Sequence, residues 1–260
     1  MIGFIGAGHM ASALVRGMVL GGVQPEMLAA YDVLPACLQA LPEGVLAAKS
    51  LGELAACADT LVLAVKPKNA QEVLDQLRGM NFSGVLVSIV LGFTQATLAA
   101  ALPKAQIIRL MPNTPAEVGE GVLVFNANHA LSKEEFGSLS DKFAACGRVM
   151  LLPEAMMDGV TGISGSGPAY VYLFIEAFAD AGVREGLPRQ TAYELAAQTV
   201  KGAAEMVLST GKHPGALKDA VCSPGGSTIE AVYALEKAGL RAAVMDGVKA
   251  CAQKAAGMAK

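Results

Sequence analysis

A short turn near the C-terminus carries the residue types best suited to chemistry. Residues 223–228 read Ser-Pro-Gly-Gly-Ser-Thr, and the proline and glycines let the backbone turn sharply and point its N–H groups at a small anion. Ser227 and Glu230 have the spacing of a capping box, which predicts a helix from Ser227 to about Lys237. A helix N-terminus behind a glycine turn favours a carboxylate or phosphate, and Thr228 adds a hydroxyl. The alternative is a plain tight turn between two helices.

A second glycine turn lies at the start of the chain. Residues 6–11 form a G-x-G-x-x-A pattern directly after the apolar run Met1–Ile5, and a helical pattern follows to Leu20. In such a pattern the first glycine allows a tight turn, the second lets a pyrophosphate approach the backbone, and the small Ala11 lets the helix pack on the strand. This context predicts a dinucleotide cofactor.

An acidic residue follows the next expected strand. The apolar run from about Leu28 to Tyr31 ends at Asp32, where an acidic side chain takes the adenosine ribose hydroxyls in an NAD-type site; a surface aspartate is the alternative. The segment Val33 to Cys37 contains no Arg or Lys to read a 2′-phosphate, and the Asp32 carboxylate repels such a phosphate. We therefore predict measurable use of NADH.

Expected strands and helices alternate through the first 152 residues, and they position these turns. We expect strands at Thr60–Val65, Val85–Leu91, Ile107–Met111, Val122–Phe125 and Arg148–Leu152, and helices that begin at Ser50 and Ser132. This order predicts an α/β fold with an N-terminal, doubly wound sheet of Rossmann type. Its ligands are expected along the carboxyl ends of the strands, near which Lys66, Ser88 and Asn113 fall.

From residue 153 the pattern is helical to the C-terminus. We expect a long helix from Pro168 to Ala181, a helix to about Leu208 capped by Thr191 and Glu194, and a last helix from about Leu240. Several are apolar around most of their circumference, as residues 170–175 show. A small helical domain does not bury so much apolar surface alone, so we infer an intertwined homodimer and two domains, 1–152 and an all-α domain 153–260.

Composition limits the other partners. The chain has 260 residues and a formal net charge of −3, so it is not basic enough to indicate nucleic acid. Its five cysteines lie far apart, and His9, His129 and His213 show no ligand spacing, so we expect neither a disulfide framework nor a metal. The long uncharged stretches are broken by Gly and Pro, which argues against a membrane span. With a strand from Ile2 and no leader, we expect a cytoplasmic protein.

Four stretches resemble those of the pyrroline-5-carboxylate reductase family. They are Phe4–Ala11, Leu63–Pro67, Arg109–Pro115, and the pair Thr161–Tyr170 with His213–Glu230. They span nearly the whole chain in the family's order, and the Ser-Pro-Gly-Gly segment before a threonine is specific to it. The resemblance changes the expectation for residues 223–228 from a plain turn to a substrate site.

The resemblance implies NAD(P)H-dependent reduction of the C=N bond of 1-pyrroline-5-carboxylate to L-proline, the last step of proline biosynthesis. It implies a Rossmann domain that holds NADP(H) or NAD(H), and a helical domain that dimerises, with dimers often assembling into decamers. The cofactor-binding residues carried over are Gly6, Ala7, Gly8, His9, Met10, Ala11, Ala64, Val65, Lys66 and Pro67, to which we add Asp32 and Ser88 from their places in the sheet. The substrate-binding residues carried over are Val221, Ser223, Gly225, Gly226, Ser227 and Thr228.

Thr228 is the candidate catalytic residue. The imine nitrogen gains electron density as hydride arrives, so it must be protonated or hydrogen-bonded. We expect Thr228 to hydrogen-bond this nitrogen and relay a proton, or only to orient the substrate while water or a protonated iminium supplies the proton. The N–H groups of Gly225 to Ser227 are expected to hold the substrate carboxylate.

Two other interpretations stand beside this one. The β-hydroxyacid dehydrogenases also place helices after a fingerprint domain, but they use a lysine shortly after a glycine-rich segment, and here no lysine follows Gly167 until Lys201. A non-catalytic dinucleotide sensor would keep the fold and bind partners through its apolar helices. The intact turn with Thr228 argues against such a sensor.

Overall fold

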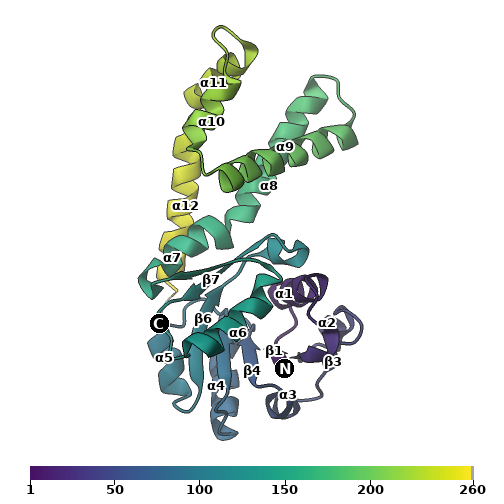
Figure 1. Cartoon of the computed structure of the whole chain (residues 1–260), viewed down its shortest axis with the longest axis vertical. Coiled ribbons are helices and arrows are strands. Elements are labelled where there is room, and N and C mark those ends of the chain that lie inside the picture. Colours follow the sequence, from purple (N-terminus) through teal and green to yellow (C-terminus); the bar gives the residue numbers. More distant parts are fainter. Residues whose placement is uncertain (259–260) are drawn as a thin grey trace. The chain divides into compact units, whose positions relative to one another are not determined.

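The computed structural model describes residues 1–258 and contains an eight-stranded sheet with helices on both faces (Figure 1). The strands are β1 (Ile2–Ile5), β2 (Leu28–Tyr31), β3 (Leu46–Ala47), β4 (Thr60–Leu63), β5 (Val85–Ser88), β6 (Gln106–Met111), β7 (Gly121–Asn126) and β8 (Gly147–Leu152). The helices around them are α1 (His9–Leu20), α2 (Pro35–Gln39), α3 (Leu51–Cys57), α4 (Pro67–Gly79), α5 (Gln95–Ala101), α6 (Lys133–Ala144) and α7 (Met157–Val160), with the 3-10 turn η2 (Thr114–Val118). The predicted α/β fold with a Rossmann-type sheet and a helical C-terminal part is confirmed. Strand β3 and helix α2 are short, and no sequence pattern indicated them.

The strand order places a ligand crevice beside β1. The strands run β3-β2-β1-β4-β5-β6-β7-β8, so the order reverses between β1 and β4. Strands β1 to β6 are parallel, whereas β7 is antiparallel to β6 and β8 is parallel to β7. Only η2 connects β6 to β7, and so short a connection cannot return the chain for a parallel pairing. Folds of this type bind ligands at the carboxyl ends of the strands where the order reverses.

Two apolar cores lie on opposite faces of the sheet. On one face, Leu14 of α1 and Phe143 of α6 pack against the strands. On the other face, α3, α4 and α5 pack against Leu61 and Leu63 of β4. Val62, between these two residues, belongs to the first core because side chains alternate along a strand. All three are fully buried, as the continuous apolar run predicted for a strand covered on both faces.

Helix α6 begins with the predicted capping box, whereas helix α9 (Arg189–Thr210) begins before its predicted cap. The Ser132 hydroxyl accepts from the Glu135 N–H, and the Glu135 carboxylate accepts from the Ser132 N–H, which completes a capping box. These bonds hold the pKa of the Glu135 carboxyl below its usual value. The prediction that Thr191 caps the next helix is wrong, since α9 already begins after Pro188 and Thr191 lies within its first turn.

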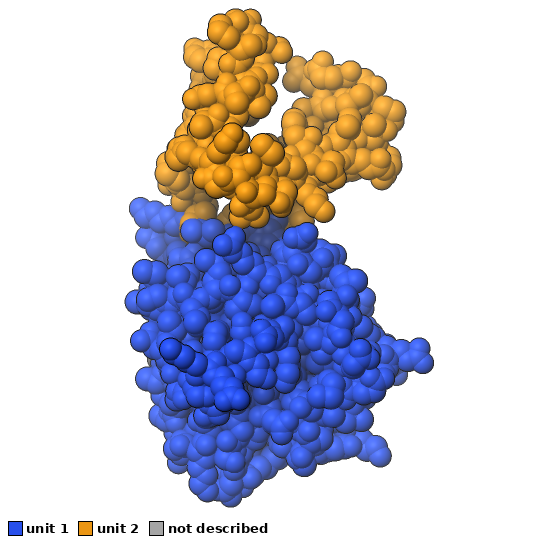
Figure 2. Space-filling model, viewed as in Figure 1, with its two compact units in different colours: residues 1–168, 249–260 blue, residues 169–248 orange. Residues whose placement is uncertain are grey.

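The other helices of the C-terminal part are α8 (Gly167–Arg184), α10 (Pro214–Val221), α11 (Ser227–Lys237) and α12 (Leu240–Ala256). Contacts divide the chain into two compact units: Met1–Pro168 with the segment from Lys249 onward, hereafter the sheet unit, and Ala169–Val248, hereafter the helical unit (Figure 2). Helices α8 and α12 each contribute residues to both units. The division into domains 1–152 and 153–260 stays a prediction.

The helical unit has a small apolar core. Its buried cluster consists of Ala179, Ala192 and Ala196, with Ile175 and Val183 packed against it. Large apolar side chains are exposed instead, among them Tyr172, Leu173, Leu195, Leu208, Tyr233, Val244 and Met245. So many exposed large apolar side chains on one unit are typical of an association surface. Within residues 1–258, no helix combines the length and the apolar character needed to cross a membrane.

Candidate active site

The first turn of the sheet unit has the backbone that a dinucleotide site requires. Gly6 has φ +95°, and its N–H donates to the Tyr31 carbonyl at 2.8 Å. A Cβ at this position would lie 2.8 Å from the Ala64 carbonyl oxygen, so only glycine fits there. Gly8, in contrast, is exposed, and a Cβ added to it would meet no atom within 4 Å. The backbone is therefore open where a pyrophosphate approaches.

The N-terminus of α1 complements that turn. Gly8 is the N-cap, no side chain caps the helix, and the first turn holds no acidic residue. Its N–H groups and the positive end of the helix dipole thus face the open side of the turn, beside His9 and Met10. Ala11 is buried in the core between helix and strand, as its small size predicted. These residues fit the pyrophosphate of a dinucleotide.

Residues 64–67 follow β4 and lie beside the glycine turn, at the place where the strand order predicts the ligand. The Ala64 N–H donates to the Ile5 carbonyl at 2.9 Å, which continues the β1–β4 pairing past the strands. Lys66 is exposed at the N-cap of α4, and Pro67 is the first residue of that helix. The N-terminus of α4 also lacks a side-chain cap and a first-turn acid. Ala64 and Val65 lie directly against the Gly6 backbone.

Ser88 ends strand β5, but its hydroxyl does not face an open cavity. The side chain is buried, and its oxygen accepts from the Val90 N–H at 3.3 Å. This bond holds the loop after β5 in place. Contact between Ser88 and the cofactor stays a prediction.

Asp32 contacts the glycine turn itself, which the sequence did not indicate. One carboxylate oxygen accepts from the Ala7 N–H at 2.7 Å, and the other accepts from the Leu34 N–H at 2.8 Å. The carboxylate at the end of β2 is therefore fixed in place beside the turn. Its position next to the crevice is the one expected for a ribose-binding acid.

Two side chains, Arg109 within β6 and Asn113 just after it, make structural contacts. Asn113 is buried, donates to the Ser164 carbonyl at 3.0 Å and accepts from the Val122 N–H at 2.8 Å. Arg109 forms an ion pair with Glu154 at 2.6 Å, and the same carboxylate oxygen accepts from the N–H of Gln95 at 2.7 Å. Sequence reasoning missed both, because neither partner is close in the chain to the residue it binds.

The second turn, in the helical unit, is built by its own backbone. Gly225 has φ +69°, and the Gly226 N–H donates to the Ser223 carbonyl at 3.0 Å. The prediction of a capping box between Ser227 and Glu230 is wrong, because Gly226 is the N-cap of α11 and Ser227 is already its first residue. Without a side chain at Gly226, the start of this helix has no side-chain cap.

At the uncapped start of α11, the residues predicted to bind the substrate are wholly or partly exposed. Ser223 and Ser227 are exposed, and Val221 is exposed at the end of α10. Thr228 is half-buried, and its hydroxyl has no hydrogen-bond partner within the part of the chain that the structure describes. A helix N-terminus with free N–H groups and a neighbouring hydroxyl can bind a carboxylate and donate to a second polar atom. The cofactor residues belong to the sheet unit and these residues to the helical unit.

His213 and His129 make structural contacts. The His213 ring accepts from the Gly215 N–H at 3.1 Å and caps α10. His129 stacks on Phe136, and burial lowers the pKa of its imidazole. Burial also raises the pKa of the Cys146 thiol to about 12, so this thiol stays protonated at neutral pH. Among residues 1–258, no group of three His, Cys, Asp or Glu residues is placed to hold a metal.

The sheet order, the open glycine turn and the helical C-terminal part define a dinucleotide-dependent oxidoreductase. Comparison with known families agrees with this class. Residues 1–92 match the family described as NADP oxidoreductase, coenzyme F420-dependent. Residues 154–258 match the family described as pyrroline-5-carboxylate reductase dimerisation.

Individual relatives identify the family. The chain is 45% identical to the pyrroline-5-carboxylate reductase of Escherichia coli, covering 100% of this chain and 98% of the relative. It is 41% identical to the Arabidopsis thaliana protein of the same name, covering 97% and 93%. The solved structure of Plasmodium falciparum pyrroline carboxylate reductase with NADP bound superimposes with a TM-score of 0.90, at 37% identity and with 100% and 98% covered. The chain belongs to the pyrroline-5-carboxylate reductase family.

Proposed function

We propose that this chain catalyses the NAD(P)H-dependent reduction of 1-pyrroline-5-carboxylate to L-proline, the last step of proline biosynthesis. The observation that carries the proposal is the presence, in one chain, of the open glycine turn 6–11 and the uncapped turn 223–228. The chain's identity to the Escherichia coli reductase over its full length supports the same activity. A non-catalytic sensor has no need of an unpartnered hydroxyl beside a free helix N-terminus.

Different residues of the turn 223–228 bind different parts of the substrate. The N–H groups of Gly225, Gly226 and Ser227 hold the substrate carboxylate at the positive end of α11. The Thr228 hydroxyl, one residue further along the helix, donates to the imine nitrogen as that nitrogen gains electron density. Val221 and Ser223 border the ring. When bound, the reduced nicotinamide supplies the hydride.

A turnover experiment tests this function. Purified protein is mixed with 1-pyrroline-5-carboxylate and either NADH or NADPH, and loss of the reduced nicotinamide is followed by its absorbance. We expect turnover that forms proline. The matched control is 1-pyrroline, which lacks the carboxylate, and its kcat/KM should be lower by about a hundredfold because the N–H groups of the turn have no anion to bind. Binding of both cofactors without turnover of either substrate would instead support the sensor.

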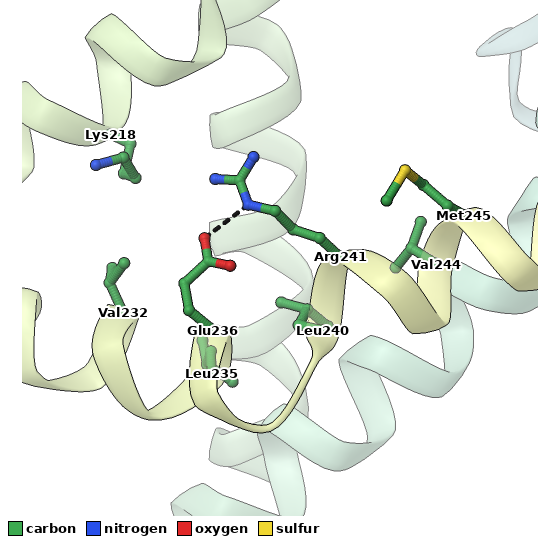
Figure 3. Close-up of a pocket in the computed structure, with 8 residues that line it drawn as sticks. All are labelled: Lys218, Val232, Leu235, Glu236, Leu240, Arg241, Val244 and Met245. Carbon is green, nitrogen blue, oxygen red and sulfur yellow. Dashed lines mark hydrogen bonds and ion pairs between the residues drawn. The ribbon is translucent and has the colours of Figure 1, made fainter.

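We also propose that the chain forms a homodimer through its helical unit, and that dimers assemble into a decamer. A groove of about 550 Å³ lies on α11 and α12. Figure 3 shows the side chains that line it, which are Val232, Leu235, Leu240, Val244 and Met245, with the Glu236–Arg241 ion pair and Lys218 at its border. No residue of the turn 223–228 lines it, so the groove suits a helix of a second copy rather than the substrate. The match of residues 154–258 to a dimerisation family supports this assignment.

The oligomer is tested by light scattering during size-exclusion chromatography. The wild-type mass is expected at an even multiple of the 26.6 kDa chain. Val244→Glu should reduce it, because a charge in an apolar interface lacks a partner. Leu20→Glu, on α1 in the sheet unit, is the control and should leave the mass unchanged, since Leu20 is similarly exposed but lies outside the groove. A monomeric wild type would refute the dimer.

The cellular setting is proposed on composition. The net charge of −3 gives no overall positive charge to attract nucleic acid, and cysteines far apart in the sequence suit a reducing compartment. We propose that the enzyme acts in the cytoplasm, without a nucleic-acid partner.

A further inference from the structure

We propose that Asp32 makes this chain selective for NADH over NADPH, because its carboxylate is fixed by the glycine turn at the place where a 2′-phosphate would lie. The inference rests on the proposed function in that it concerns the same cofactor site. It sets this chain apart from the Plasmodium falciparum relative, which was solved with NADP bound.

Two hydrogen bonds hold the Asp32 carboxylate in place. One of its oxygens accepts from the Ala7 N–H at 2.7 Å, and the other accepts from the Leu34 N–H at 2.8 Å. Rotation away from the crevice would leave two backbone N–H groups without their acceptor, one of them within the glycine turn. A carboxylate offers about four acceptor positions, so about two remain after these bonds. Two is the number that the 2′- and 3′-hydroxyls of an NAD ribose require.

No basic residue in the segment after Asp32 offsets the negative charge of its carboxylate. Between Asp32 and Lys49 the sequence contains no Lys, Arg or His. The residues directly after Asp32 are Val33, which is 77% exposed, and Leu34, which is 60% exposed. These exposed apolar side chains offer no hydrogen-bond donor to a phosphate. A 2′-phosphate would therefore meet a fixed negative charge with no cation from this segment to offset the repulsion.

One arginine does reach this region, but it is already engaged. Arg16 of α1 donates to the Ala40 carbonyl at 2.7 Å, just beyond α2, and lies 3.7 Å from a carboxylate oxygen of Glu117. Both contacts hold its guanidinium at the far end of α2 from Asp32. Arg16 is thus a bridge between α1 and α2 rather than a reader of the 2′-phosphate.

Binding measurements on the full-length protein test the proposal independently of turnover. Calorimetric titration with NAD⁺ and NADP⁺, without substrate, should give a Kd for NAD⁺ at least tenfold below that for NADP⁺. The Asp32→Ser variant removes the charge and keeps a small hydroxyl acceptor near the Ala7 N–H. We expect this variant to lower the NAD⁺ preference by at least tenfold, through both weaker NAD⁺ binding and tighter NADP⁺ binding. The ratios of kcat/KM for NADH and NADPH should change in parallel.

The control separates the local effect from a change in net charge. Asp59 precedes β4, at the opposite ends of the parallel strands from Asp32, and Asp59→Ser changes the net charge equally. This control should leave the NAD⁺ to NADP⁺ ratio at the wild-type value. A wild-type protein that binds NADP⁺ as tightly as NAD⁺ would overturn the proposal. So would an Asp32→Ser variant that loses both affinities equally, because Asp32 would then only brace the turn. Failure of the proposed function would appear as absent turnover with these binding ratios intact.

Discussion

Replacing Thr228 by valine is expected to lower kcat by about tenfold or more while the protein remains folded. Valine keeps the shape of the side chain and removes only the hydroxyl, which has no hydrogen-bond partner among residues 1–258 and therefore stabilises nothing within the chain. Loss of the hydroxyl should therefore lower kcat, because the imine nitrogen lacks a hydrogen-bond donor during the reaction, and should not change the stability of the fold. A positioned proton donor typically contributes about a hundredfold or more, and an orienting hydrogen bond contributes less. The size of the loss thus separates the two roles left open for Thr228.

Two further variants serve as controls for this prediction. Thr228→Ser keeps the hydroxyl and should retain most of kcat, whereas Thr228→Ala removes both hydroxyl and methyl and should behave as Thr228→Val does. KM for the substrate should change less than kcat, because the carboxylate is held by backbone N–H groups that these variants keep. Steady-state kinetics gives kcat and KM for each variant, and thermal unfolding shows whether the variant is folded. Full activity in Thr228→Val would mean that the proton and the orientation come from other groups.

The largest expected effect on stability is that of Gly17→Ala. Gly17 lies in α1 where that helix packs on η2, and an added Cβ would lie 1.9 Å from the Ala116 carbonyl oxygen and 3.1 Å from the Cys146 sulfur. The clash is with backbone, so the helix itself must move away. Overpacking of this kind costs about 3 kcal/mol, which outweighs the gain of about 1 kcal/mol that alanine brings to a helix. Because α1 begins at the glycine turn 6–11, its displacement should also weaken cofactor binding.

Gly137→Ala is the matched control. Gly137 is also within a helix, α6, but a Cβ there would meet no atom within 4 Å. We expect Gly137→Ala to raise the free energy of unfolding by about 0.5–1 kcal/mol through helix propensity alone. Urea unfolding of the two variants and the wild type gives the comparison. Equal free energies for Gly17→Ala and Gly137→Ala would contradict the close packing of α1 on η2.

The sequence alone predicted those features that depend on residues close together in the chain. Strands β2, β4 and β5 begin at the predicted residues, since unbroken apolar runs form strands covered on both faces. The Ser132–Glu135 capping box and the positive φ at Gly6 follow from local backbone geometry. The motifs likewise predicted the family correctly, because each motif is a contiguous stretch of sequence.

The tertiary structure decided what depends on distant residues. Ser227 and Glu230 have the spacing of a capping box, yet Gly226 is the N-cap of α11. The geometry of the preceding turn, rather than this local spacing, therefore sets where the helix begins. The reversal of β7, the bond from Ala7 to the Asp32 carboxylate and the ion pair of Arg109 with Glu154 each join segments that no local pattern relates. Gly17 resembles any helical glycine until Ala116 is placed against it. Contacts between such distant segments form only when the sheet and its two apolar cores have assembled, and for that reason only the folded chain reveals them.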